Sequence, residues 1–151
     1  MKLKPLMTMH ADLKAPADVG KGPYGQRTIF DVTAGTFKGD KLSGTILPSG
    51  GDWILIDDQG IGHLDVRITL KTDDDALLYV QYYGVLEMNQ AVMTAIAGGK
   101  PTEFGDIYFM TQPRVETGDE RYQWLNNIVA VAEGRVVDSG VEYQVYELVN
   151  D

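Results

Sequence analysis

The chain has 151 residues, the size of one domain with a single hydrophobic core. It carries 22 acidic and 13 basic residues, and the resulting net charge of −9 would repel nucleic-acid phosphates and anionic membrane surfaces. Because it has no cysteine, it forms no disulfide and offers no thiolate nucleophile or cysteine-ligated metal site. We therefore expect one domain, residues 1–151, with no nucleic-acid partner and no membrane partner.

The first residues lack the long apolar core of a signal peptide, and no apolar run approaches the roughly 18 residues of a transmembrane helix. Cytoplasmic localisation is the default expectation for such a sequence.

The first third of the chain contains short runs in which apolar and polar residues alternate, and this period of two predicts β-strands. Strands are predicted at residues 5–13, at residues 27–34 and in a segment that ends at Pro48. A loop is predicted between the first two, at residues 14–24, and a bend or bulge at residues 35–44.

The turn after Pro48 is the most unusual segment of the sequence. Pro48 cannot donate a ladder hydrogen bond, and Gly50 and Gly51 would allow positive φ angles. Asp52 and Trp53 leave the turn together, directly before an apolar strand. Either the turn directs a carboxylate and an aromatic wall into a pocket, or Trp53 packs in the core while Asp52 caps the turn.

A hairpin is predicted in the middle of the chain, where residues 62–71 and 76–86 alternate in polarity around an acidic turn. The first of these strands has one wholly aliphatic face, with Asp65 and Arg67 on the opposite face. These two residues line a cavity or lie on the solvated surface, depending on which face turns inward. Tyr79 and Tyr83 on the second strand favour a cavity wall that binds a carbonyl or carboxylate oxygen.

The rest of the chain contains the one predicted helix, at residues 87–97, where apolar residues recur at helical spacing before Gly98. A strand ended by Pro113 is predicted at residues 106–112, followed by a single helical turn at residues 116–127 with Thr117 or Asp119 as its N-cap. Two closing strands are predicted at residues 128–135 and 141–148.

Glu116, Tyr122 and Trp124 surround the predicted helical turn and form a second candidate site. A carboxyl group beside aromatic surface can have its pKa raised into the range of general acid–base catalysis. The alternative is a capping box with Trp124 as a core residue.

Eight to ten short strands and one helix predict an all-β fold. We expect a single antiparallel closed β-barrel rather than two open sheets, because closure removes exposed strand edges. The interior of a barrel of this size is either filled by side chains or wide enough for one small ligand.

The sequence lacks the motifs of several common chemistries. His10 and His63 stand far apart and have no metal-ligand spacing around them, so no metal site is expected. No serine has a nucleophile-elbow context, and no glycine-rich run follows a strand and opens a helix. We therefore expect no cofactor.

Several segments occur in an order that resembles the family of domain of unknown function 3237, over nearly the whole chain from Gly20. They are Gly35–Gly39, Leu42–Pro48, Gly51–Trp53, Asp65–Arg67, Thr72–Asp74, Pro113–Thr117 and Tyr122–Asn126. The resemblance implies a compact β-barrel of the allene oxide cyclase or calycin-like kind. It also implies roles beyond packing for Asp52, Trp53, Arg67, Glu116, Tyr122, Trp124 and Asn126. Asp75 replaces the glycine usual in the family, and His63 is not part of the family pattern.

The leading hypothesis is a cofactor-independent lyase or isomerase that moves a proton on a small, partly apolar carbonyl compound bound in the barrel. The predicted catalytic residues are Arg67 and Tyr83, which would polarise the carbonyl oxygen, and Asp52 and Glu116, either of which would move the proton. The predicted substrate-binding residues are Trp53, Asp65, Tyr79, Tyr122, Trp124 and Asn126. The alternatives are a lipocalin-like carrier of a small ligand and a structural interaction module. A homo-oligomer, with a dimer as first choice, is expected in each case.

Overall fold

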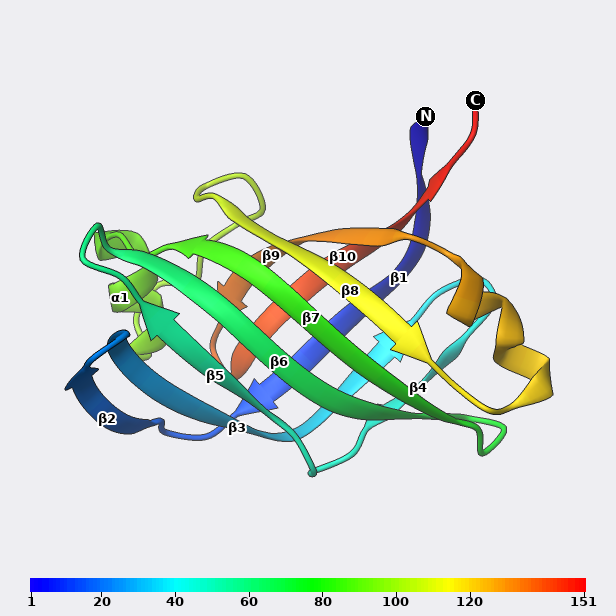
Figure 1. Ribbon diagram of the computed structural model, residues 1–151, viewed down its shortest axis with the longest axis horizontal. Helices are drawn as coiled ribbons and strands as arrows, with labels where there is room; N and C mark the ends of the chain where they lie inside the picture. Colours follow the sequence, from blue (N-terminus) through cyan, green and yellow to red (C-terminus); the bar gives the residue numbers. More distant parts are fainter.

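The computed structural model describes residues 1–151 and has the predicted all-β architecture, a closed antiparallel barrel (Figure 1). The wall has eight strand positions, one of which is shared by β4 and β5, since both lie between β3 and β6. Pairing of β1 with β3 closes the barrel. The strands are β1 (Lys2–Leu13), β2 (Ala17–Gly22), β3 (Gly25–Lys38), β4 (Ser43–Ile46), β5 (Gly51–Ile56), β6 (Ile61–Thr72), β7 (Leu77–Glu87), β8 (Phe109–Glu116), β9 (Ala130–Val137) and β10 (Gly140–Val149).

Two helices lie at opposite ends of the barrel (Figure 1). The α-helix α1 (Gln90–Ile96) is shorter than the predicted segment because Asn89 caps it, accepting a hydrogen bond from the Val92 N–H. The 3₁₀-helix η1 (Glu120–Asn127) begins after Asp119, which is one of the two N-caps predicted for it. Neither helix has the length and apolar character needed to cross a bilayer.

Several predicted boundaries are wrong, and two of them alter the strand pairing. Residues 14–24, predicted as a loop, contain β2, which folds back on the start of β3. Pro113 does not end its strand but lies within β8, opposite Tyr82 of β7. Proline is tolerated there because the ladder between β8 and β9 is formed only at Met110 and Thr111, so no β9 bond is lost at Pro113.

Strand alternation decides which side chains reach the interior. In β6 the aliphatic residues Leu64, Val66, Ile68 and Leu70 are all at most 3% exposed, and they join a single core of 30 buried residues. The polar residues between them therefore point out of the barrel. Of the two placements considered for the polar face of the β6–β7 hairpin, the cavity wall is therefore excluded and the outer surface is correct.

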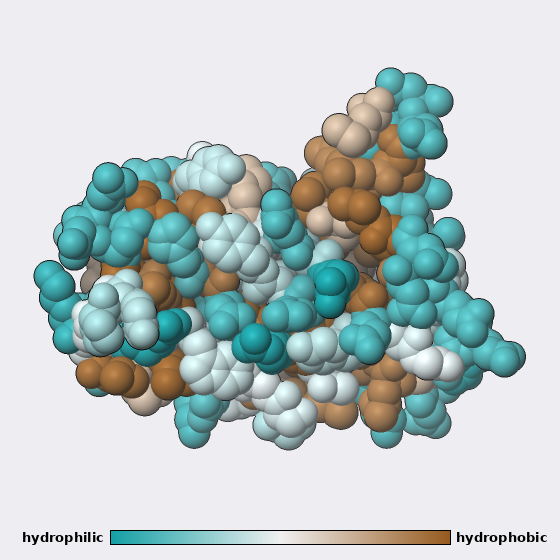
Figure 2. All heavy atoms as spheres, viewed as in Figure 1, coloured by the Kyte–Doolittle hydropathy of each residue, from teal (hydrophilic) through white to brown (hydrophobic).

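The outer wall is not uniformly polar. Figure 2 shows hydrophobic side chains gathered where the paired ends of β1 and β10 leave the barrel. A hollow of about 490 Å³ lies on this outer wall, with Leu3, Tyr108 and Met110 among its lining residues.

Candidate functional site

The barrel interior is hollow at the end that carries α1. A cavity of about 380 Å³ opens there, and 20 of the 29 residues that line it are hydrophobic, so that the few polar groups on its wall stand out. The outer-wall hollow is larger, but the inner cavity is the better candidate because it alone contains an acid with a strongly raised pKa.

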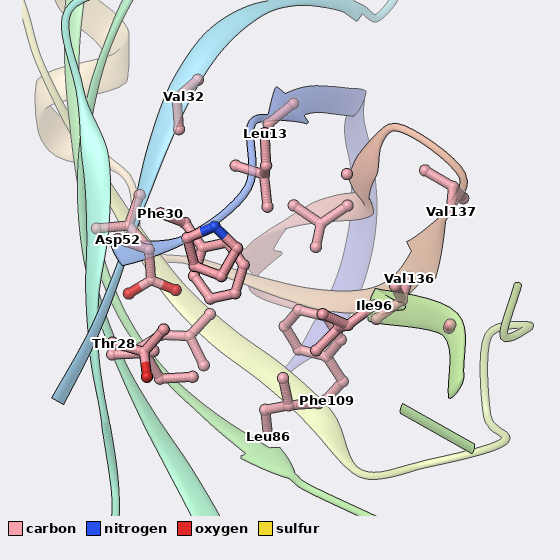
Figure 3. Close-up of a pocket in the computed structure, with 18 of the residues that line it drawn as sticks. Leu13, Thr28, Phe30, Val32, Asp52, Leu86, Ile96, Phe109, Val136 and Val137 are labelled. Carbon is pink, nitrogen blue, oxygen red and sulfur yellow. The ribbon is translucent and has the colours of Figure 1, made fainter. Parts of the chain in front are cut away.

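That acid is Asp52. On β5 it faces inward, opposite Phe30 of β3 and Val66 of β6, and Figure 3 shows its carboxylate turned into the cavity on the same wall as Thr28. Its Oδ1 accepts a hydrogen bond from the Asp65 backbone N–H at 3.1 Å. Its Oδ2 has no hydrogen-bond partner in the protein, and Asp52 belongs to none of the ion pairs of the chain. One carboxylate oxygen is thus left for a ligand.

The surroundings of Asp52 raise its pKa from an ordinary 3.8 to about 7. Burial is the largest cause, because an apolar wall disfavours the charged form. The negative charge of Asp65 acts in the same direction, while the hydrogen bond from the Asp65 N–H acts against it. Near neutral pH both protonation states of Asp52 are populated, so it can either donate or accept a proton.

The turn that positions Asp52 works differently from the prediction. Gly50 and Gly51 do not have positive φ angles. They are required for close packing instead: a Cβ on Gly51 would lie 2.8 Å from the Phe30 carbonyl oxygen, and one on Gly50 would collide with the Arg67 carbonyl oxygen. The chain can therefore pass between β3 and β6 and enter β5 with Asp52 turned inward.

Two tyrosines that lie within predicted strands but were not predicted as site residues form part of the cavity wall. Tyr82 of β7 and Tyr143 of β10 are 3% and 1% exposed, and their hydroxyl oxygens lie 3.1 Å apart. A signal for them was present in the sequence, since a tyrosine in the register of aliphatic residues brings a hydroxyl into the interior.

Polar residues at the mouth form their own network. The Asp18 carboxylate accepts hydrogen bonds from the Gln26 side-chain amide at 3.0 Å and from the Thr28 hydroxyl at 3.4 Å. The Lys14 ammonium pairs with Asp31 at 2.8 Å. The cation at the mouth is thus already neutralised.

The structure places Asp52 alone of the four predicted catalytic residues in the cavity. Arg67 lies outside the barrel, 3.3 Å from Asp65 and over the ring of Trp53 at 5.8 Å. Tyr83 is half-exposed on the outer face, where its hydroxyl lies 3.3 Å from the ring of His63. Tyr79 shares this outward register, because the inward positions of β7 carry Leu78, Val80 and Tyr82.

The second predicted cluster lies around η1, at the end of the barrel opposite α1 (Figure 1). Glu116 is exposed on the outer face of β8. The Tyr122 hydroxyl donates to Asp74 at 2.8 Å, and the Lys41 ammonium covers the Trp124 ring at 4.6 Å. The Asn126 side chain accepts from the Thr117 N–H at 2.8 Å and donates to its carbonyl at 2.9 Å. These contacts hold η1 in place and are not connected to the cavity of Asp52.

The interior of the site is therefore an apolar chamber with the Asp52 carboxyl group, which is in no ion pair, and two phenol hydroxyls on its wall. No three His, Asp or Glu side chains converge at a point that could hold a metal ion. The chamber can bind a small, mostly apolar molecule and exchange a proton with it.

Several known proteins are similar to this chain in sequence and in structure. The UPF0311 protein RPA1785 of Rhodopseudomonas palustris is 32% identical over 125 residues, which are 83% of this chain and 82% of that protein. Its crystal structure, described as a conserved protein of unknown function, matches with a TM-score of 0.88 over 98% of this chain and 97% of that one. A β-barrel-like protein of Acinetobacter baumannii, ABAYE2633, is 34% identical with a TM-score of 0.82 over 98% and 96% of the two chains.

Two fungal proteins are more distant. The PR-toxin biosynthesis cluster protein 7 of Penicillium roqueforti is 28% identical over 100 residues, 64% of this chain and 54% of that protein. A crystal structure described as an enzyme from Penicillium herquei shares the fold, with a TM-score of 0.73 and 16% identity over 97% and 94% of the two chains. The family model described as protein of unknown function DUF3237 matches residues 1–148. The chain therefore belongs to the DUF3237 family.

Proposed function

We propose that this protein is an enzyme that transfers a proton on a small, uncharged and mostly apolar molecule held in the barrel, with Asp52 as the acid–base group. The observation that carries the proposal is the Asp52 carboxyl group, which has no ion-pair partner and a pKa of about 7 on the inner wall of an apolar cavity. A structural carboxylate would be expected to have a cation or several donors around it, and Asp52 has one backbone N–H.

The chemistry that fits this group is proton transfer next to a carbonyl. The Asp52 carboxylate removes a proton from the carbon beside the carbonyl, and the electron pair of that C–H bond moves into an enolate. The Asp52 carboxylic acid then returns the proton to the same or a conjugated carbon, which gives exchange or isomerisation. In a β-hydroxy ketone, the electron pair of the enolate instead forms a C=C bond as the β C–O bond breaks. The departing oxygen takes the proton from the Asp52 carboxylic acid and leaves as water, which gives dehydration. All of these are lyase or isomerase reactions that use groups of the chain itself.

The charge around the mouth narrows the substrate class. Asp18 and Asp138 line the mouth, and the Lys14 ammonium is engaged by Asp31. Together with the net charge of −9, these carboxylates would repel an anionic substrate. The existence of a relative named for a fungal toxin biosynthesis cluster supports chemistry on small organic molecules of this kind.

Deuterium exchange tests the proposal without knowledge of the natural substrate. The protein is incubated in D₂O with cyclic and open-chain enones and β-hydroxy ketones, and incorporation next to the carbonyl is followed by NMR. Because an acid–base group contributes a factor of about 10²–10⁴, we expect Asp52→Asn to lower the exchange rate at least about 100-fold. Asp40→Asn, at an exposed turn outside the cavity, is the matched control and should exchange at the wild-type rate.

Equal rates for wild type and Asp52→Asn would contradict the proposal. Saturable binding of the ketones with exchange at the background rate would favour the alternative, a barrel that carries a small apolar ligand.

A further inference from the structure

Tyr82 and Tyr143 form a pair on the cavity wall that the acid–base proposal does not use. Their rings pack edge to face, with centroids 5.4 Å apart at 73°, and the Phe109 ring packs edge to face on Tyr143, also at 5.4 Å. Both side chains are buried apart from what they present to the cavity. Rings held from several sides fix the two hydroxyl groups in position.

A count of hydroxyl protons shows that this pair has a donor to spare. Two phenol groups carry two O–H protons, and the only hydrogen bond of either hydroxyl is the one between them, at 3.1 Å. Whichever tyrosine donates that bond, the proton of the other has no acceptor in the protein. A buried hydroxyl without an acceptor is costly, so this position favours a ligand that brings an oxygen.

The donor stays a donor over the whole physiological pH range. Burial raises the pKa of Tyr82 and of Tyr143 well above the ordinary value of 10, and the charge of Asp52 contributes in both cases. The protonation of each hydroxyl therefore depends in part on the charge of Asp52. A neutral phenol beside a carboxyl group in an apolar site is a combination suited to proton transfer next to a carbonyl.

The strand register sets the distance between the two groups. Asp52 lies opposite Val66, and Val66 lies opposite Tyr82, so the acid and the tyrosine are two strands apart on the inner wall. Neighbouring strands are about 4.8 Å apart, which separates their backbones by about 10 Å along the wall. Both side chains extend into the same cavity between these positions.

We infer that the Tyr82–Tyr143 pair binds the carbonyl oxygen of the substrate and so selects neutral ketones and aldehydes that present a C–H bond to Asp52. This inference rests on the proposed function. As Asp52 removes the proton, the carbonyl oxygen becomes an enolate oxygen, and the free phenol O–H donates to it. The bond from the other tyrosine polarises that donor and strengthens it. The pair takes the role that the sequence analysis gave to Arg67 and Tyr83.

The arrangement makes single and double variants differ sharply. Tyr82→Phe leaves the Tyr143 hydroxyl free to donate, and Tyr143→Phe leaves that of Tyr82. Only the double variant lacks every donor. Removing an oxyanion donor costs about 10²–10³ in rate, so we expect that loss in the double variant and a smaller one in each single variant.

The decisive readout is the carbonyl itself, observed as the ¹³C resonance of 3-methyl-2-cyclohexenone labelled at the carbonyl carbon and saturating the protein. We expect the resonance of the bound ketone to lie downfield of its value in hydrocarbon solvent in the wild type and in both single variants. In the double variant it should return to the hydrocarbon value. Asp52→Asn should keep the downfield shift while losing deuterium exchange.

The outcomes separate the two proposals. A double variant with the wild-type carbonyl shift, or a wild type in which the ketone shows no shift or no saturable binding, overturns the inference about the tyrosines. If the carbonyl shifts are as expected in all variants but Asp52→Asn still exchanges deuterium at the wild-type rate, the proposed function alone is overturned.

A second measurement covers the case in which the double variant does not fold. The affinity of the intact wild type for 3-methyl-2-cyclohexenone is compared with that for 1-methylcyclohexene, which has nearly the same shape but no oxygen. Each affinity is corrected for the free energy of moving the compound from water into hydrocarbon. We then expect the ketone to bind at least about 10-fold more tightly, because a hydrogen bond in an apolar medium is worth more than the about 1.4 kcal/mol that this factor represents. Equal corrected affinities would contradict the inference.

Discussion

The carboxyl groups of Asp52, Asp57 and Asp74 differ in pKa because their surroundings differ. Hydrogen bonds from His63, and then from backbone N–H groups, hold the pKa of Asp57 below its ordinary value. Hydrogen bonds from Thr72 and then Tyr122 lower that of Asp74. Asp52 has a single backbone donor in an apolar wall, and burial raises its pKa to about 7. Two of these groups are built for structure, and the third is left able to exchange a proton.

The outward position of Arg67 and Glu116 gives a prediction at the same scale. Arg67 is an exposed partner of Asp65, and Glu116 is exposed on β8, so neither reaches a ligand in the cavity. We expect Arg67→Gln and Glu116→Gln each to keep deuterium exchange within about twofold of wild type, as surface changes usually have small effects. A loss approaching that of Asp52→Asn in either variant would show that the cavity is not the site of the reaction.

Sequence reasoning found one member of the site and missed two. Asp52 could be singled out because a Pro–Gly turn does not require an acid at its exit. Arg67 and Tyr83 were misplaced because alternation shows that two faces differ, and only the closed barrel shows which one turns inward. Tyr82 and Tyr143 were not singled out because the sequence does not show which groups an inward hydroxyl meets, and the fold shows that these two meet each other.

At the scale of elements, most strands could be predicted because alternation is strong where one face is buried. The hairpin of β6 and β7 was predicted as two alternating runs joined by an acidic turn, and the two strands pair along their length. β2 was missed because glycine and proline around it indicate a loop, while its pairing with β3 supplies the strand. The strand of β8 was predicted to end at Pro113 because proline lacks an N–H, but pairing with β7 continues the strand past it.

The close packing at Gly50 gives a prediction for the element that carries Asp52. A methyl group there would press on the Arg67 carbonyl, which belongs to a central strand and cannot move freely. We expect Gly50→Ala to lower the free energy of unfolding by about 1–3 kcal/mol, measured by urea denaturation, and to lower exchange by displacing Asp52. Gly118→Ala is the control, because a Cβ at Gly118 would meet nothing within 4 Å. Equal stability of the two variants would mean that β5 has room the structure does not show.

At the scale of the whole molecule, the barrel combines a filled half with a hollow half. The end near η1 is closed by Tyr122 and Leu125, which belong to the continuous core. The end near α1 keeps the cavity, and half-exposed Met93 and Ile96 of α1 are among its lining residues. Packing in the filled half stabilises the folded protein, whereas burial of a partly charged carboxyl group at the other end lowers the free energy of unfolding.

The sign of that effect on stability follows from linkage. Between an unfolded pKa near 3.8 and a folded pKa near 7, the folded protein binds a proton at Asp52 and the unfolded chain does not. Stability therefore falls as the pH rises through this window, and levels off above about pH 7. Because the amide of Asp52→Asn does not titrate, the variant lacks this loss.

The most direct test of an acid poised near neutrality in the cavity is the free energy of unfolding of wild type and Asp52→Asn, measured by urea denaturation from pH 5 to pH 8. We predict that the wild type loses about 2–3 kcal/mol relative to the variant over this range, with the difference levelling off near pH 7. A difference that stays constant across the range would mean that Asp52 titrates like an exposed aspartate, and the account of the site would be wrong.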